Sequence, residues 1–139
     1  MSIMVTGGTG FIGQRIVRKL VERGEEVVCF DLAPPRANME PLLDRIKVYR
    51  GDMLQVPHLL EAINTHQVHK IIHMAALLPP DTEDRPHFGM QVNIQGTNNV
   101  FTVINGRKLL CRISRKSKDG KEDVEVELEL LRVSVRAAD

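Results

Sequence analysis

The chain has 139 residues, a formal net charge of +1 at pH 7 and 42% hydrophobic residues. This length suits one domain or part of one and is short for an enzyme that also carries a substrate-binding region. The balanced charge argues against nucleic acid as a partner. Two cysteines far apart in sequence, no signal-peptide pattern and no apolar run of membrane-spanning length predict a cytoplasmic protein without a membrane anchor.

The first predicted element is a short apolar strand at residues 3–5, which runs into the glycine-rich sequence Thr-Gly-Gly-Thr-Gly-Phe-Ile-Gly at residues 6–13. A helical pattern follows at once. A strand that ends in closely spaced glycines and continues into a helix directs backbone N–H groups toward an anion, at the positive end of the helix dipole. The pattern predicts a pyrophosphate-binding turn whose separate steric demands are met by Gly7, Gly10 and Gly13.

Strands and helices alternate over the next ninety residues or so. A continuous apolar run ends in Asp31, as expected of a strand buried on both faces of a parallel sheet. The alternation predicts an α/β fold with an open, doubly wound sheet of about four parallel strands. The other expected elements are one helical turn around residues 39–44, strands at 46–49 and 71–74, a helix from Pro57, a loop at 79–84 and a long helix over 88–104.

The composition changes near residue 105. All seven prolines and all four phenylalanines lie before it, whereas residues 105–139 hold 9 of the 19 Lys and Arg residues. We therefore divide the chain into a domain at residues 1–104 and a charged, atypical tail at 105–139. Residues 108–113 are expected to replace a fifth strand and cover the open edge of the sheet.

A β-hairpin is predicted within this tail, over residues 109–130. Asp119-Gly120 is a two-residue hairpin signal. With this turn, Arg112 lies opposite Glu127, and the hairpin has one charged and one apolar face.

Five motifs occur in one order along residues 1–102. After the glycine turn they are Asp31-Leu32, Gly51-Asp52, Ile-His-Met-Ala-Ala at residues 72–76 and Asn-Ile-Gln-Gly-Thr-Asn-Asn-Val at residues 93–100. This set resembles the extended short-chain dehydrogenase/reductase family, the NAD-dependent epimerases and dehydratases that act largely on nucleotide-sugars. The resemblance implies a Rossmann-like fold, NAD as cofactor and a nucleotide-sugar or related alcohol as substrate.

The resemblance also implies a role for each motif. The glycine turn holds the pyrophosphate, the carboxylate after the second strand binds the adenosine ribose, Gly51-Asp52 contacts adenine, and the small pair after the fourth strand lies along the ribose and nicotinamide. The helix asparagine supports the active site. The implied cofactor-binding residues are Gly7, Gly10, Phe11, Ile12, Gly13, Asp31, Asp52, Met53, Ala75, Ala76 and Asn93.

The preference for NAD over NADP follows from the chemistry of Asp31. Its carboxylate can accept hydrogen bonds from both ribose hydroxyls and would repel a 2′-phosphate. Arg36, a few residues later, would soften that preference. Structural alternatives also stand: Asp52 as a helix cap, and Ala75 and Ala76 as packing residues.

The family's catalytic Tyr-x-x-x-Lys motif does not occur in the sequence. The one tyrosine, Tyr49, lies on a predicted strand, and Met53 occupies the fourth place after it. We therefore assign no catalytic residue. We expect an incomplete amino-terminal, NAD-binding half that is not catalytically competent alone and whose downstream sequence has been replaced.

Two further interpretations remain open. One is a non-enzymatic NAD sensor that binds a partner, or a second copy of itself, through the tail; the other is an unstable truncated product. No metal site is expected, because His66, His69 and His73 span a helix end and a strand without a common face. The acidic residues at 81–84 are expected to form a solvated loop.

Overall fold

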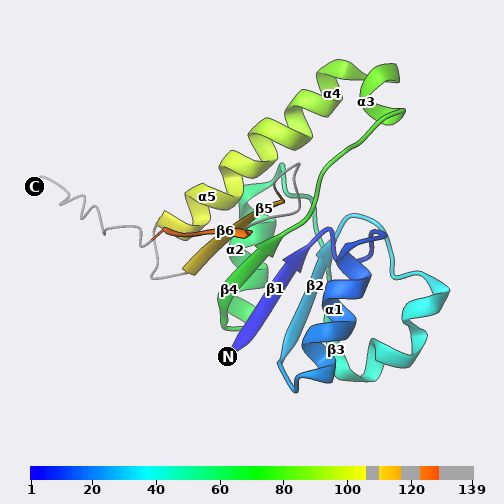
Figure 1. Cartoon of the computed structure of the whole chain (residues 1–139), viewed down its shortest axis with the longest axis vertical. Helices are drawn as coiled ribbons and strands as arrows, with labels where there is room; N and C mark the ends of the chain where they lie inside the picture. Colours follow the sequence, from blue (N-terminus) through cyan, green and yellow to red (C-terminus); the bar gives the residue numbers. More distant parts are fainter. Residues whose placement is uncertain (106–109, 117–122, 129–139) are drawn as a thin grey trace, which may run out of the picture.

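A computed structural model of the chain describes residues 1–105, 110–116 and 123–128. The element order alternates strand and helix as the sequence predicts (Figure 1). The elements are β1 (Ser2–Thr6), α1 (Gly13–Glu22), β2 (Val27–Asp31), the 3₁₀ segment η1 (Ala37–Arg45), β3 (Ile46–Arg50), α2 (Val56–Thr65), β4 (Val68–His73), α3 (Asp81–Asp84), α4 (Pro86–Met90), the π-helical segment η2 (Gln91–Gly96), α5 (Thr97–Asn105), β5 (Leu110–Lys116) and β6 (Asp123–Leu128).

The sheet has the strand order β3-β2-β1-β4-β5-β6. Strands β1 to β4 are parallel, which confirms the predicted four-stranded, doubly wound core. Strand β5 continues the parallel set beside β4, with Lys70 opposite Leu110, so part of the tail does occupy the fifth position. Because the order reverses between β1 and β4, loops that follow the strands diverge there and leave room for a ligand.

The tail hairpin has the predicted register. Strands β5 and β6 are antiparallel, with Arg112 opposite Glu127 and Ile113 opposite Val126. The predicted turn at residues 119–120 and the outermost pair, Leu109 with Leu130, lie outside the described residues.

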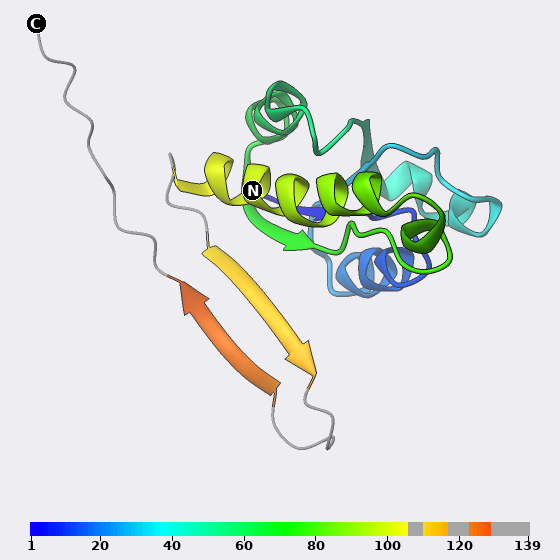
Figure 2. The same cartoon turned by 90° about the horizontal axis from the view of Figure 1, so that it is seen from above.

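Helices cover both faces of the sheet (Figure 2). Along β1, Met4 faces α2 and α5, whereas the next residue, Val5, faces α1 and η1. Both residues are fully buried. This alternation of two apolar faces on one strand is the reason that the strands of a covered parallel sheet have continuous hydrophobic sequences. Among the described helices, none is long and apolar enough to cross a lipid bilayer.

The predicted long helix at residues 88–104 is interrupted by a π-helical turn at η2. Thr97, the residue after this turn, donates a hydrogen bond from its hydroxyl to the carbonyl oxygen of Asn93 at 2.7 Å. Such a bond from a side chain to the preceding turn competes with the regular ladder of the helix. A π turn of this kind often marks a functional site.

The acidic stretch after Pro80 forms a short helix, α3, so the prediction of a loop there was wrong. The N–H groups of Glu83 and Asp84 donate to the carbonyl oxygen of Pro80, and Arg85 lies 3.6 Å from the carboxylate of Asp81. Carboxylates in the first turn stabilise a helix start, which explains why these four residues coil rather than extend.

Candidate functional site

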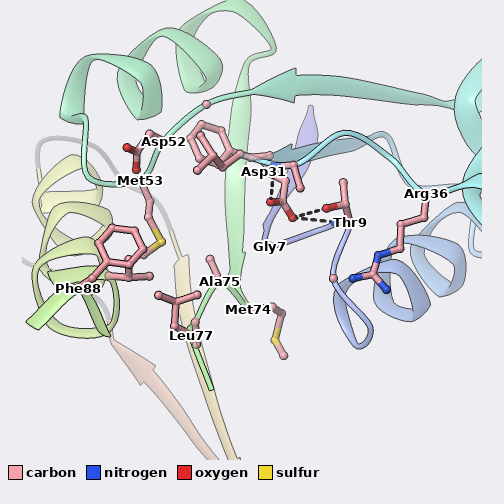
Figure 3. Close-up of a pocket in the computed structure, with 17 residues that line it drawn as sticks. Gly7, Thr9, Asp31, Arg36, Asp52, Met53, Met74, Ala75, Leu77 and Phe88 are labelled. Carbon is pink, nitrogen blue, oxygen red and sulfur yellow. Dashed lines mark hydrogen bonds between the residues drawn. The ribbon is translucent and has the colours of Figure 1, made fainter. Parts of the chain in front are cut away.

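A cavity of about 330 Å³ opens at the carboxyl ends of the parallel strands. Its walls come from the loops after β1, β2, β3 and β4 and from the start of the long helix (Figure 3). Four of the five motifs that resemble the dehydrogenase family converge here, from positions as far apart in sequence as Gly7 and Ala76. The lining residues are Gly7, Thr9, Gly10, Phe30, Asp31, Leu32, Ala33, Arg36, Gly51, Asp52, Met53, Met74, Ala75, Ala76, Leu77, Phe88 and Val92.

Two glycines of the turn are required by close contacts. Gly7 has φ +68°, and a Cβ there would lie 2.7 Å from the backbone N of Ala75. A Cβ on Gly13 would collide with the carbonyl oxygen of Gly7 and lie 2.9 Å from Gly8 Cα. Because neither position carries a side chain, the turn can lie against β4 and α1 can start directly under it.

The start of α1 is open to an anion. Its N-cap residue, Ile12, makes no side-chain cap, and its first turn contains no acidic residue. The backbone N–H groups of Phe11, Ile12 and Gly13 donate to no other described residue. Unpaired amides at a helix N-terminus attract a phosphate through both hydrogen bonding and the helix dipole.

Asp31 ends β2 and faces the glycine turn across the cavity mouth (Figure 3). Its Oδ2 accepts hydrogen bonds from the backbone N and Oγ1 of Thr9, at 3.0 and 2.7 Å, and its Oδ1 accepts one from the N of Ala33 at 3.1 Å. A carboxylate has about four lone-pair sites. These three bonds occupy both sites of Oδ2 and one of Oδ1, so Oδ1 can accept one further hydrogen bond. The carboxylate is therefore held in place and still able to accept from a ligand hydroxyl.

Asp52 and Met53 line the other end of the cavity, near Phe88 (Figure 3). Asp52 Oδ1 accepts a hydrogen bond from the N of Leu54 at 2.8 Å. The N-cap position of α2 is held by Gln55, so Asp52 forms a turn and does not cap the helix. The ring of Phe30 stacks on Tyr49 beneath this region, with ring centres 5.6 Å apart, and gives it an apolar floor.

Ala75 and Ala76 follow β4 and also line the cavity. The backbone of Ala75 packs so closely against the glycine turn that a Cβ on Gly7 would not fit between them. Asn93 lies behind the wall: its side-chain amide donates to the O of Leu77 at 2.9 Å and accepts from the N of Leu77 at 2.8 Å. It therefore fixes the loop after β4 and does not line the cavity itself.

Of the predicted site residues, the structure gathers seven in the cavity wall: Gly7, Gly10, Asp31, Asp52, Met53, Ala75 and Ala76. Phe11 and Ile12 lie at the exposed start of α1, 63% and 55% exposed, and the Arg15 guanidinium is 4.5 Å from the centre of the Phe11 ring. Gly13 is buried below the turn. The binding roles of all these residues remain predictions.

Several wall residues were not among the predicted site residues. Phe88 and Val92 come from the long helix, and no local motif marks them, because only the fold brings that helix over the cavity. The hydrogen bonds that Thr9 donates to Asp31 were not predicted either, because they join the glycine turn to the end of the next strand. Among the described residues, no group of three His, Cys, Asp or Glu side chains is placed to hold a metal ion.

The fold and this cavity define a Rossmann-like, doubly wound α/β domain with a ligand cavity at the point where its strand order reverses. The sequence profile of the NAD dependent epimerase/dehydratase family matches residues 3–119, beyond residue 102, where the motifs end. The chain belongs to this family.

Known relatives act on different molecules. D-erythronate dehydrogenase of Haemophilus influenzae is 29% identical over 108 residues, which are 74% of this chain and 33% of that protein. Human 3 beta-hydroxysteroid dehydrogenase type 7 is 33% identical over 103 residues, which are 70% of this chain and 27% of that protein. The matched part of the chain thus spans 33% and 27% of the length of these two relatives.

A solved structure with a similar fold contains NAD. The UDP-glucose 4-epimerase of Thermus thermophilus, in complex with NAD, superposes with a TM-score of 0.67 at 28% identity. The match covers 76% of this chain and 34% of that one.

Proposed function

We propose that the domain binds NAD across the cavity, with the pyrophosphate at the start of α1. Gly7, Gly10 and the free amides of residues 11–13 hold the pyrophosphate, and Asp31 accepts a hydrogen bond from the adenosine ribose. Asp52 and Met53 form the adenine end, and Ala75 and Ala76 border the nicotinamide end. This orientation places the two halves of the dinucleotide on either side of β1, as in other doubly wound domains.

One observation carries this proposal: the uncapped start of α1 and the carboxylate of Asp31 meet through Thr9 at the mouth of one cavity. A helix N-terminus alone would serve any anion. A fixed carboxylate beside it repels most anions and favours one that also carries hydroxyl donors. A dinucleotide has both groups in one molecule.

NAD, when bound, supplies hydride chemistry at its nicotinamide. The residues of this chain bind and orient it, and the apolar wall formed by Met74, Ala75 and Leu77 limits water at that end. The sequence contains no Tyr-x-x-x-Lys motif to move the proton that must accompany the hydride. We therefore propose that this chain binds NAD without turning over substrate by itself.

The substrate class is also a proposal. The relatives named above carry the names of three different substrates: D-erythronate, a 3 beta-hydroxysteroid and UDP-glucose. We propose an alcohol of the nucleotide-sugar class for the complete system in which this domain acts.

The binding proposal is tested by titration calorimetry with NAD and, separately, with NADP. We expect NAD to bind more tightly than NADP, because Asp31 repels the 2′-phosphate. Asp31→Asn should weaken the affinity for NAD about tenfold, equivalent to about 1.4 kcal/mol. It should also reduce the difference in affinity between NAD and NADP. Asp44→Asn, an exposed carboxylate outside the cavity, serves as the matched control. Absence of NAD binding to the unaltered chain would refute the proposal.

The second half of the proposal concerns turnover. The chain is incubated with NAD and a panel of nucleotide-sugars, and NADH is followed by its absorbance. We expect no NADH above the rate without protein. Steady formation of NADH with any substrate would show that the chain supplies its own proton acceptor.

A second candidate function is an NAD-dependent interaction module. It is favoured by the pairing of β5 with β4, the strand whose continuation forms one cavity wall, since that pairing connects the tail to the cofactor site. Limited proteolysis with and without NAD distinguishes the two: a change in cleavage within residues 105–139 supports the module, and an unchanged pattern contradicts it.

A further inference from the structure

His73, the last residue of β4, bridges two elements at the base of the cavity. Its Nδ1 lies 2.6 Å from the hydroxyl of Thr6 at the end of β1. Its Nε2 lies 3.1 Å from the hydroxyl of Thr97 at the start of α5. The sequence motif contains this histidine, but neither the motif nor the proposed cofactor contacts give it a task.

The directions of these hydrogen bonds follow from their neighbours. The Thr97 hydroxyl donates to the carbonyl oxygen of Asn93, so it must accept from His73 Nε2–H. The hydroxyl oxygen of Thr6, Oγ1, accepts a hydrogen bond from the N–H of Met74 at 3.2 Å. The hydroxyl proton of Thr6 can therefore point at His73 Nδ1. The chain of bonds is therefore consistent with one neutral tautomer, protonated at Nε2.

Both ends of this chain of bonds hold backbone that lines the cavity. At one end, Thr6 Oγ1 accepts from the N–H groups of Met74 and Ala75, at 3.2 and 3.5 Å. At the other end, the amide of Asn93 binds both backbone groups of Leu77. Met74, Ala75 and Leu77 lie next to one another along one wall of the cavity (Figure 3).

We propose that His73 is a positioning residue: as the neutral Nε2–H tautomer it joins Thr6 to Thr97 and so holds the cavity wall from Met74 to Leu77 in the shape that receives the dinucleotide. This inference rests on the proposed function for the identity of the ligand. The hydrogen-bond chain itself does not depend on it.

The surroundings of His73 favour its neutral form. Burial lowers the pKa of His73 below its usual value. Strand β1 and the helical segments from Gln91 to Asn105 contain no ionisable side chain. The other ionisable residues of the neighbouring strands are His69 and Lys70 on β4 and, in the sequence of β5, Cys111, Arg112, Arg115 and Lys116. None of these elements contains a carboxylate that would favour the protonated ring. A second proton would place an N–H against Thr6 Oγ1 and leave the Thr6 hydroxyl proton without its acceptor.

The chain offers a matched pair of variants. Thr97 and Thr102 are both on α5, and both hydroxyls donate to the carbonyl oxygen four residues earlier, at 2.7 and 2.9 Å, but of the two only Thr97 bonds to His73. We expect Thr97→Val to weaken NAD binding about tenfold and Thr102→Val to change it less than about twofold. Thr97→Ser keeps the hydroxyl and should restore binding. Equal effects of the two valine variants would overturn the proposal.

A second measurement needs no ligand. Long-range ¹H–¹⁵N spectra of the histidine rings should show His73 protonated at Nε2, and hydrogen exchange should show the Leu77 amide less protected in Thr97→Val than in Thr102→Val. An Nδ1–H tautomer, or equal protection in both variants, would overturn the proposal. If the unaltered chain binds no NAD and these ligand-free results hold, the proposed function fails and the hydrogen-bond chain stands.

Discussion

Cys29 lies directly beneath the glycine turn, where its side chain is fully buried. A Cβ on Gly8 would be 2.6 Å from its Sγ, so the thiol fills the space under the turn. Burial, and secondarily the charge of Asp31, raise the pKa of Cys29 to about 12. The residue is therefore a packing group and not a nucleophile.

This gives a prediction for thiol reactivity. In a Cys111→Ser background, Cys29 is the one remaining cysteine of the two in the sequence. Because its pKa lies about three units above that of a free thiol, we expect its reaction with a disulfide reagent at pH 8 to be about a thousandfold slower in the native protein than in denaturant. Stopped-flow absorbance measures both rates. Similar rates would mean that the turn opens readily.

Individual residues of the site differ in how far sequence alone predicts them. The roles of Gly7 and Asp31 can be predicted from sequence, because each residue comes at the end of a strand. Gly7 meets a steric requirement of the turn and Asp31 supplies a charge, and both are local properties. The hydrogen bonds of Asn93 to Leu77 join groups sixteen residues apart, and they exist because the helix crosses the end of β4. No local pattern contains that crossing, which is why the resemblance could suggest a supporting role for Asn93 but not its partner.

At the scale of elements, α1 and the turn before it form one unit. Gly13 starts the helix where any side chain would meet the backbone of Gly7 and Gly8, which cannot move aside as a flexible side chain could. Gly24, after the other end of the helix, has φ +78° and nothing within 4 Å of its absent Cβ. Gly13 is therefore required because a side chain would not fit, and Gly24 because of its left-handed backbone conformation.

We predict that Gly13→Ala lowers the free energy of unfolding by about 3 kcal/mol, through overpacking of the turn, and Gly24→Ala by about 1 kcal/mol, through its left-handed backbone alone. Urea titration measures both. Gly13→Ala should also weaken NAD binding, since α1 is displaced from the turn, whereas Gly24→Ala should not. A smaller loss for Gly13→Ala than for Gly24→Ala would contradict this account of the turn.

The strands and their order were predictable because parallel pairing and right-handed crossovers leave few arrangements for alternating elements. The π-helical turn η2 was not, since the hydrophobic spacing of residues 88–104 continues through it. Two side-chain interactions lie at this turn, the bond from Thr97 to the carbonyl oxygen of Asn93 and the bond from Asn93 to Leu77, and the hydrophobic spacing contains neither. The tail hairpin was predictable in register, because opposite charges and apolar residues pair in one alignment only.

At the scale of the whole molecule, the stability of the fold should depend on pH through His73. Its pKa is lowered in the native state by burial, so the unfolded chain binds a proton first as pH falls. The contribution of neutral His73 to the free energy of unfolding is complete above the pKa of a histidine in the unfolded chain, about 6.5. It is lost as pH falls below that value.

We predict that the melting temperature of the unaltered chain falls between pH 7.5 and pH 5.5. The His73→Gln variant should have a lower melting temperature at pH 7.5, and that temperature should fall less over the same pH range. Differential scanning calorimetry at several pH values measures both slopes. Parallel slopes for the two proteins would assign the pH dependence to other groups.

The central place of β1 has a consequence for synthesis on the ribosome. Strand β1 pairs with β2 soon after it emerges, but its other edge waits for β4, since Ser2 pairs with Val68. At about 5–20 residues per second, that edge stays uncovered for roughly 3–13 s. During this interval the nascent chain presents Ile3, Met4 and Val5 as an open apolar strand, so its yield in the cell should depend on chaperones that shield emerging chains.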